Sequence, residues 1–234
     1  MLITVPPISR RELCAALLAG AAPAVQVAAA GAGFARYRYA GMVLPHDSPA
    51  KPDAPLVAVE VRLDRYDPQT RIPPHELIER AAATAAKLGA ARLILNGRTC
   101  YDGHLDRDAL TNKCIALNQA GRLCMSKRLG MRYRHGRGEF GGNALEMEML
   151  MLRTNAELVG VALDPAEVQR AGADMVNFFA RHQHRMDVIY VREWESVKYA
   201  KLAAEIANRK WQGWLVQSPA SAEARKALAG LFKV

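Results

Sequence analysis

The chain has 234 residues, half of them hydrophobic, and a formal net charge of +9. This length supports one domain with a substantial core and is short for two. The Lys and Arg residues are dispersed and do not alternate with aromatic residues in a recognition motif, so the charge indicates a basic surface and not a nucleic-acid-binding protein.

The amino-terminal segment differs in composition from everything that follows it. Arg10 and Arg11 precede a run without charged residues that ends in three alanines at Ala30. An arginine pair, a moderately apolar run and a small-residue site, in this order, are typical of a twin-arginine export signal. The run is too rich in alanine, and too interrupted by proline and glutamine, for a stable membrane span. We therefore expect a signal peptide at residues 1–30 and a periplasmic or secreted mature domain at residues 31–234.

The cysteines do not form a recognisable framework. Removal of the signal would leave Cys100, Cys114 and Cys124, an odd number without the spacing of a zinc site. Cys114 and Cys124 lie ten residues apart on one expected helix, about 15 Å along its axis, which is too far for a disulfide.

After a proline-rich stretch at residues 44–55, short apolar runs alternate with amphipathic segments. Strands are expected at 36–44, 56–61, 92–95, 131–135, 158–163, 188–191 and 213–216. Helices are expected at 74–88, 106–129, 144–153, 174–181, 195–208 and 219–232. Asn143 is expected to cap the third of these helices.

This alternation predicts an α/β fold. Each strand-plus-helix unit takes roughly 25 to 40 residues, as in repeated βα units, which close into a barrel or open into a doubly wound sheet. No glycine-rich phosphate loop follows a strand, which disfavours the doubly wound alternative. We predict a TIM (β/α)8-type barrel in which seven strands are recognisable and the eighth is missing or unrecognised.

In such a barrel the site is built from residues that follow the carboxyl ends of the strands. Any one polar residue at these places could simply be a solvated loop residue, but a set of them can converge. The set is Asp64, Asn96, Arg98, Arg134, His135, Arg137, Glu139, Asp164, Glu167, Arg192, Glu193 and Gln217.

Four segments carry a resemblance to a known family. Residues 130–140 resemble a segment in which a Gly-aliphatic strand leads through Tyr-His-Asn-His to Glu-Phe, and residues 157–174 are similar to Glu-Leu-Val-Gly-x-x-Leu-Asp-Thr-Gly-His followed by Arg-Ala-Gly-x-Asp. Residues 184–193 resemble Asp-Arg-Ile-x-x-Val-His-Leu-Lys-Asp, and residues 213–216 resemble Gly-Trp-x-Val. The family is that of sugar phosphate isomerases/epimerases, the xylose isomerase-like TIM barrels. The resemblance runs unbroken from about Pro73 to Val234, and the chain looks shortened on the amino-terminal side.

The resemblance implies a divalent metal ion, held by carboxylates and histidines, that binds sugar oxygens while an acidic residue moves a proton. Asp164 matches the family's aspartate. At four other ligand positions the chain differs, with Arg134 and Glu167 in place of histidines, Tyr190 in place of the strand-end histidine and Gln217 in place of the last glutamate. A weak metal site at Asp164, or none, is therefore expected.

The first functional hypothesis is an isomerase, epimerase or related lyase, with Glu139, Asp164 and Glu167 as catalytic residues. A sugar or polyol would be bound by Arg134, His135, Arg137, Tyr190, Arg192, Glu193 and Gln217. The alternative is a metal-free, catalytically inactive protein that binds its ligand through the same residues. Abasic-site endonuclease activity, a third hypothesis, follows only from the shared fold and needs a histidine-rich multi-zinc site that the sequence does not contain. The sequence does not decide the cofactor, the substrate or the oligomeric state.

Overall fold

The computed structural model describes residues 38–39, 42–45, 56–61, 66–191 and 199–217. The predicted signal peptide and the predicted last helix lie outside these residues. No helix in the described part of the chain is long and apolar enough to cross a membrane.

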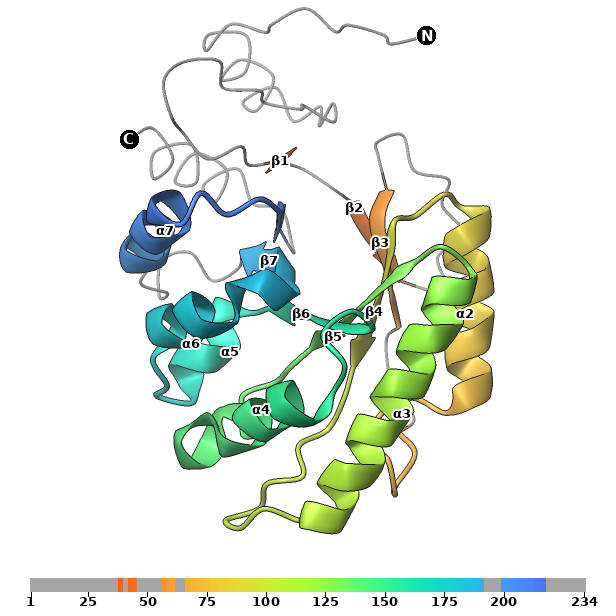
Figure 1. Cartoon of the computed structure of the whole chain (residues 1–234), viewed down its shortest axis with the longest axis horizontal. Helices are drawn as coiled ribbons and strands as arrows, with labels where there is room; N and C mark the ends of the chain where they lie inside the picture. Colours follow the sequence, from red (N-terminus) through yellow and green to blue (C-terminus); the bar gives the residue numbers. More distant parts are fainter. Residues whose placement is uncertain (1–37, 40–41, 46–55, 62–65, 192–198, 218–234) are drawn as a thin grey trace, which may run out of the picture.

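The centre of the molecule is a single curled sheet in which every paired strand is parallel to its neighbour (Figure 1). The spatial order is β1-β8-β7-β6-β5-β4-β3-β2, so strands from β2 to β8 follow chain order. The strands are β1 Arg38–Tyr39, β2 Met42–Pro45, β3 Leu56–Val61, β4 Arg92–Asn96, β5 Gly130–Arg134, β6 Val159–Leu163, β7 Met186–Val191 and β8 Trp214–Gln217. This is the α/β fold predicted from the sequence, an incomplete TIM-type barrel.

The two edge strands of the sheet, β1 and β2, are close together along the chain. β1 pairs with β8 and β2 pairs with β3, yet Tyr39 and Met42 are separated by only three peptide links, which span at most about 11 Å. The segment predicted as one strand at residues 36–44 thus supplies both ends of the sheet.

Helices alternate with the strands and lie around the outside of the sheet (Figure 1). The helices are α2 His75–Lys87, α3 Arg107–Ser126, α4 Gly141–Arg153, α5 Pro165–Arg170, α6 Met175–His182 and α7 Tyr199–Asn208, with short 3-10 turns η1 Gly138–Phe140 and η2 Gln183–Arg185. One face of each helix is apolar: α2 buries Ile78, Ala81, Ala82 and Ala85 against β3 and β4.

The strands divide their side chains between two cores because successive residues point to opposite faces of a sheet. The larger core packs one set of strand residues, such as Leu93 and Val161, against the helices. The smaller core lies on the inner face, where Ala58, Ile94 and Val188 meet without any helix residue. Polar side chains of the inner face therefore lie above or below this small apolar plug.

Two details differ from the sequence prediction. Asn143 does not cap a helix: with Gly142 and Ala144 it adopts left-handed backbone angles inside α4, and its φ of 59° is incompatible with the extended conformation of an N-cap. The short helix α5 was not predicted, because six residues are too few to show a helical period.

Candidate functional site

Five polar side chains of the inner face meet at the carboxyl ends of the five consecutive strands β3 to β7, four from within the strands and one from the residue directly after β6. They are Glu60 of β3, Asn96 of β4, Arg134 of β5, Asp164 directly after β6 and Tyr190 of β7. The parallel register places them together, since Glu60 pairs with Ile94 and Asn96 pairs with Arg134. We call these five residues the mouth cluster.

Arg134 is the centre of the mouth cluster. Its Nη1 donates to Glu60 Oε1 at 2.6 Å and its Nη2 donates to Asp164 Oδ2 at 2.8 Å. The guanidinium carbon lies 4.1 Å from the ring centroid of Tyr190, in cation-π contact. Burial alone lowers the pKa of Arg134, but Glu60, Tyr190 and Asp164 together raise it, so the guanidinium is a permanent charge.

The surroundings of Glu60 and Tyr190 leave a polar group for a ligand. Glu60 Oε1 also accepts from Asn96 Nδ2 at 2.9 Å, so this one oxygen joins Asn96 and Arg134. The Tyr190 hydroxyl is buried and has no hydrogen-bond partner among these residues. Burial and the nearby Glu60 carboxylate raise the pKa of Tyr190 well above its usual value, so the hydroxyl remains a donor.

His135 contacts the mouth cluster through the backbone of Asp164. Its Nε2 accepts the backbone N–H of Asp164 at 3.0 Å, which requires the proton of a neutral ring to be on Nδ1. Burial lowers the pKa of His135 to about 4, so the imidazole is neutral at physiological pH. Its ring stacks edge-on against Phe140. His135 therefore positions the Asp164 backbone and has no ligand-facing role in the described contacts.

Glu139, a predicted catalytic residue, belongs to a different network on the helix side of β5. Its Oε1 accepts from Tyr133 Oη at 2.6 Å and pairs with Lys113 Nζ at 3.3 Å. Lys113 is fully buried and also pairs with Glu146 at 2.7 Å. Burial alone lowers the pKa of Lys113, but Glu139 and Glu146 raise it, which keeps the ammonium charged. We call Lys113, Tyr133, Glu139 and Glu146 the buried lysine network.

The other predicted residues are distributed as follows. Glu167 lies on α5 and pairs with Arg170 at 2.7 Å, and Arg137 is exposed in the turn before η1. Gln217 is the last residue of β8, and Arg192, Glu193 and Asp64 lie outside the described residues. Of the predicted set, the structure thus brings together Asn96, Arg134, His135, Asp164 and Tyr190.

Sequence reasoning missed Glu60 and the buried lysine network. Glu60 is the only charge in the apolar run Leu56–Val61, and a lone carboxylate near the end of a buried strand was the signal that could have revealed it. Lys113 falls between Leu110, Cys114 and Leu117 on the buried face of α3, so a lysine on an apolar helix face was the signal there.

The mouth cluster does not fit the divalent metal that the family resemblance implies. Its two carboxylates both bind one guanidinium, a fixed cation that repels a dication and already occupies one oxygen of each carboxylate. Within the part of the chain that the structure describes, no group of three or more His, Cys, Asp and Glu side chains could hold a metal ion.

The sequence matches no family model and none of the curated proteins. Solved structures, by contrast, share its fold, and several of them are sugar isomerases or epimerases by name. One is a sugar phosphate isomerase/epimerase from Parabacteroides distasonis, with 12% identity and a TM-score of 0.57 over 75% of this chain and 69% of that chain. Another is 3-keto-D-glucoside 4-epimerase from E. coli, with 11% identity and a TM-score of 0.60 over 77% and 80%. A third is an L-ribulose 3-epimerase, with 12% identity and a TM-score of 0.58 over 76% and 67%. The chain therefore has the sugar isomerase/epimerase fold, which confirms the predicted resemblance at the level of structure.

Proposed function

We propose that this protein binds a sugar or polyol at the mouth cluster, as an isomerase/epimerase-like protein in which Arg134 stands where the metal of the family would be. The observation that carries the proposal is the arginine itself, held at 2.6 and 2.8 Å between carboxylates from two strands and flanked by an unpaired buried hydroxyl.

The charges of the cluster favour a neutral, hydroxylated ligand. One guanidinium and two carboxylates leave the described cluster with a net charge of −1, and the neutral imidazole of His135 does not change it. An anion would be repelled, whereas a polyol can donate to Glu60 and accept from Arg134 and Tyr190. Adjacent hydroxyl groups match the alternation of donors and acceptors in this cluster.

Epimerisation or isomerisation would need a base that takes a proton from carbon. The described carboxylates of the mouth cluster are both ion-paired with Arg134 through one oxygen, so either could act as a base only through its other oxygen or after the ion pair has opened. This arrangement favours the second candidate function, binding without turnover. The two candidates differ in one measurable event, the exchange of a carbon-bound proton with solvent.

The test is calorimetric titration of residues 31–234 with D-allulose, L-ribulose, D-xylose and sorbitol. We expect binding of at least one of these that is unchanged by EDTA and weakened at least about tenfold in Arg134→Gln, because one charged hydrogen-bonding group is lost. Arg107→Gln, an exposed change on α3, is the matched control. Failure of all four ligands, or binding that Arg134→Gln leaves intact, would overturn the proposal.

Two further measurements separate enzyme from binder and test the metal. Deuterium incorporation into the bound sugar in D2O would demonstrate proton abstraction, and its absence with intact binding would favour the inactive protein. Titration with manganese, zinc and magnesium should give no tight binding. Micromolar affinity that Asp164→Ala abolishes would show that the metal site has been rebuilt.

A further inference from the structure

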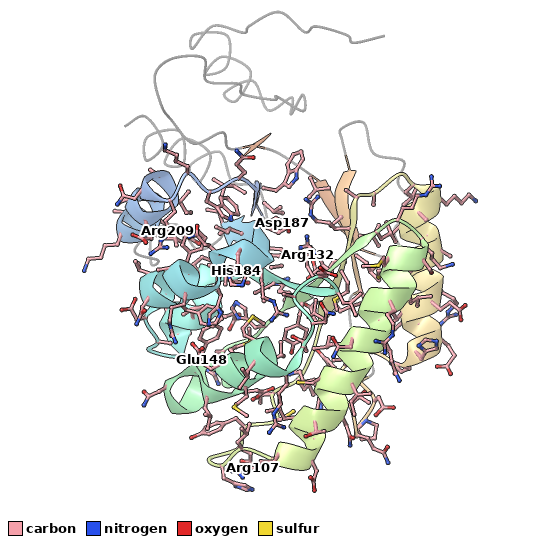
Figure 2. The ribbon with its side chains drawn as sticks, in the orientation of Figure 1. Arg107, Arg132, Glu148, His184, Asp187 and Arg209 are labelled. Carbon is pink, nitrogen blue, oxygen red and sulfur yellow. The ribbon has the colours of Figure 1, made fainter. Side chains whose placement is uncertain are left out.

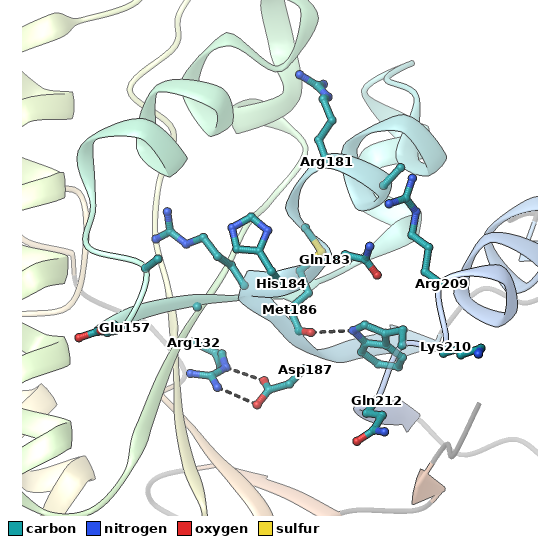
Figure 3. A pocket seen from close by; sticks show the side chains of 15 residues that line it. Arg132, Glu157, Arg181, Gln183, His184, Met186, Asp187, Arg209, Lys210 and Gln212 are labelled. Carbon is teal, nitrogen blue, oxygen red and sulfur yellow. Dashed lines mark hydrogen bonds and ion pairs between the residues drawn. The ribbon is translucent and has the colours of Figure 1, made fainter. Parts of the chain in front are cut away.

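A cavity lies at the opposite end of the sheet from the mouth cluster. It has a volume of about 660 Å³ and is lined by residues before or at the start of β6, β7 and β8, including Glu157, Met186 and Gln212 (Figure 3). The carboxyl ends of α6 and α7 reach it through Arg181 and Lys210. We call it the amino-terminal pocket. A cavity of this volume is within the range that holds small molecules.

Most of the charged side chains that line the pocket are cationic. Its charged lining residues are Arg132, Arg181, Arg185, Arg209, Lys210, Glu157 and Asp187. Outside the lining, Glu148 pairs with Arg181, Glu205 pairs with Arg209, and Arg92 shares Asp187 with Arg132. When these partners are included, the described groups keep an excess of two positive charges.

Helix ends explain only part of this charge. Basic residues at the carboxyl end of a helix complement its dipole, which accounts for Arg181 in the last turn of α6 and for Arg209 and Lys210 after α7. Arg132 and Arg185 have no such explanation, because one is on β5 and the other on η2 directly before β7.

Arg185 is a buried guanidinium without a carboxylate among its described partners. Its Nη2 donates to Val159 O at 2.6 Å and to Thr154 Oγ1 at 2.7 Å, and its Nη1 donates to Met151 O at 2.6 Å. Hydrogen bonds to neutral groups satisfy the donors but do not cancel the charge. Burial lowers the pKa of Arg185, as expected for a cation that pays desolvation without an opposite charge.

Arg132 is similarly fixed at the inner wall. Its Nε and Nη2 bind the Asp187 carboxylate at 2.5 and 2.7 Å (Figures 2 and 3). The same carboxylate accepts from Arg92 Nε at 2.8 Å. The side chain crosses over Gly160, where a Cβ would lie 2.5 Å from Arg132 Cδ. Because Gly160 has no side chain, the Arg132 side chain can pass over it and place its guanidinium in the wall of the pocket.

The pocket therefore has two tiers. The inner guanidinium groups of Arg132 and Arg185 use their hydrogens within the protein and supply a positive potential. The rim supplies donors: Lys210 and the exposed His184 make no ion pair with another described residue, and Arg209 uses its Nε on Glu205. A ligand that meets both tiers carries concentrated negative charge on several oxygens.

We propose that the amino-terminal pocket binds a small phosphorylated molecule, with its phosphate group at Arg209 and Lys210 in the field of Arg132 and Arg185. The phosphate dianion matches the charge excess and the number of rim donors. The volume beyond that group leaves space for a carbon skeleton of sugar size. This inference is independent of the function proposed for the mouth cluster, whose net charge is of the opposite sign.

The experiment is calorimetric titration of the full chain with inorganic phosphate, glucose 6-phosphate and, as an uncharged control, glucose. We expect both phosphates to bind, glucose 6-phosphate more tightly, with an affinity that falls as salt rises. The double variant Arg209→Gln/Lys210→Asn should weaken binding at least about tenfold. Asparagine is chosen because residue 210 has a φ of 51°.

The matched control removes the same charge elsewhere. Lys87→Gln/Arg107→Gln changes two exposed residues of α2 and α3, and Figure 2 shows Arg107 at the far end of the molecule from Arg209. If the two double variants lose affinity equally, the binding is nonspecific and the proposal is wrong. It is also wrong if neither phosphate binds at millimolar concentration, or if Arg134→Gln abolishes binding, which would place the anion at the mouth. Circular dichroism establishes that each variant is folded.

Discussion

The protonation state of His135 decides whether a backbone hydrogen bond at the mouth cluster can form. Its neutral ring accepts the Asp164 N–H, and protonation would put two donors face to face. Because the folded pKa of about 4 is below the ordinary value of 6.5, the folded state binds fewer protons than the unfolded state. The associated stability is fully present above pH 6.5 and is lost as the pH falls towards 4.

The resulting prediction concerns acid stability. Between pH 7 and pH 4, this residue should cost the folded state on the order of 3 kcal/mol in free energy of unfolding. His135→Gln removes the titration while its amide oxygen can still accept the Asp164 N–H. Urea unfolding at several pH values should therefore show a shallower acid decline for the variant, and parallel curves would contradict the assignment.

Lys113 is a buried residue whose positive charge balances the carboxylates of Glu139 and Glu146. Lys113→Met would leave Glu139 and Glu146 buried without their cation, and we expect a loss of about 3–5 kcal/mol. The measurement is chemical denaturation. Lys87→Met, an exposed lysine on α2, should change stability by less than about 0.5 kcal/mol. Adding Glu146→Gln to Lys113→Met should restore part of the loss, and no restoration would argue against a charge effect.

Among the elements, the strands were predicted best. Their apolar runs are short and bounded by polar residues, and the predicted 56–61 coincides with β3 Leu56–Val61. β7 begins at Met186, two residues before its prediction, because Asp187 interrupts the apolar pattern. That aspartate is ion-paired with arginines from β4 and β5, a tertiary contact that no local pattern reveals.

The packing of α3 on the loop before β6 gives an element-scale prediction. In an exposed helix, glycine to alanine is stabilising by roughly 1 kcal/mol. In α3, a Cβ at Gly121 would lie 2.6 Å from the backbone oxygen of Leu158, so Gly121→Ala should instead lower the thermal midpoint. A raised midpoint would mean that α3 does not approach Leu158 this closely.

At the scale of the whole molecule, about half of the candidate site could be predicted from the sequence. Barrel geometry selected Asn96, Arg134, His135 and Asp164 as strand-end residues and the family resemblance added Tyr190, and the structure places these five side chains close together. It could not reveal that Glu139 points to the helix side and binds Lys113, since the side chain of a turn residue is directed by packing and not by sequence position.

Export remains a prediction for the chain as a whole, because the relevant residues lie outside the described part. Replacing Arg10 and Arg11 by lysine should retain the precursor in the cytoplasm, since the twin-arginine pathway reads the pair itself. Fractionation with an immunoblot is the measurement, and the single change Arg36→Lys is a matched control. Full-length wild-type protein in the cytoplasm would contradict the signal.

The pairing of β1 with β8 has a consequence for the order of biosynthesis. In the described sheet, β1 pairs only with β8, through Arg38 with Trp214 and Tyr39 with Leu215. The first strand to be synthesised can therefore pair only after the last strand has been synthesised. Until then, β1 and β7 present unpaired edges, to which another nascent chain could add. Truncation before Trp214 should therefore yield aggregates and not a smaller folded protein, and a chain bound for a translocase that accepts folded cargo would become competent only after release from the ribosome.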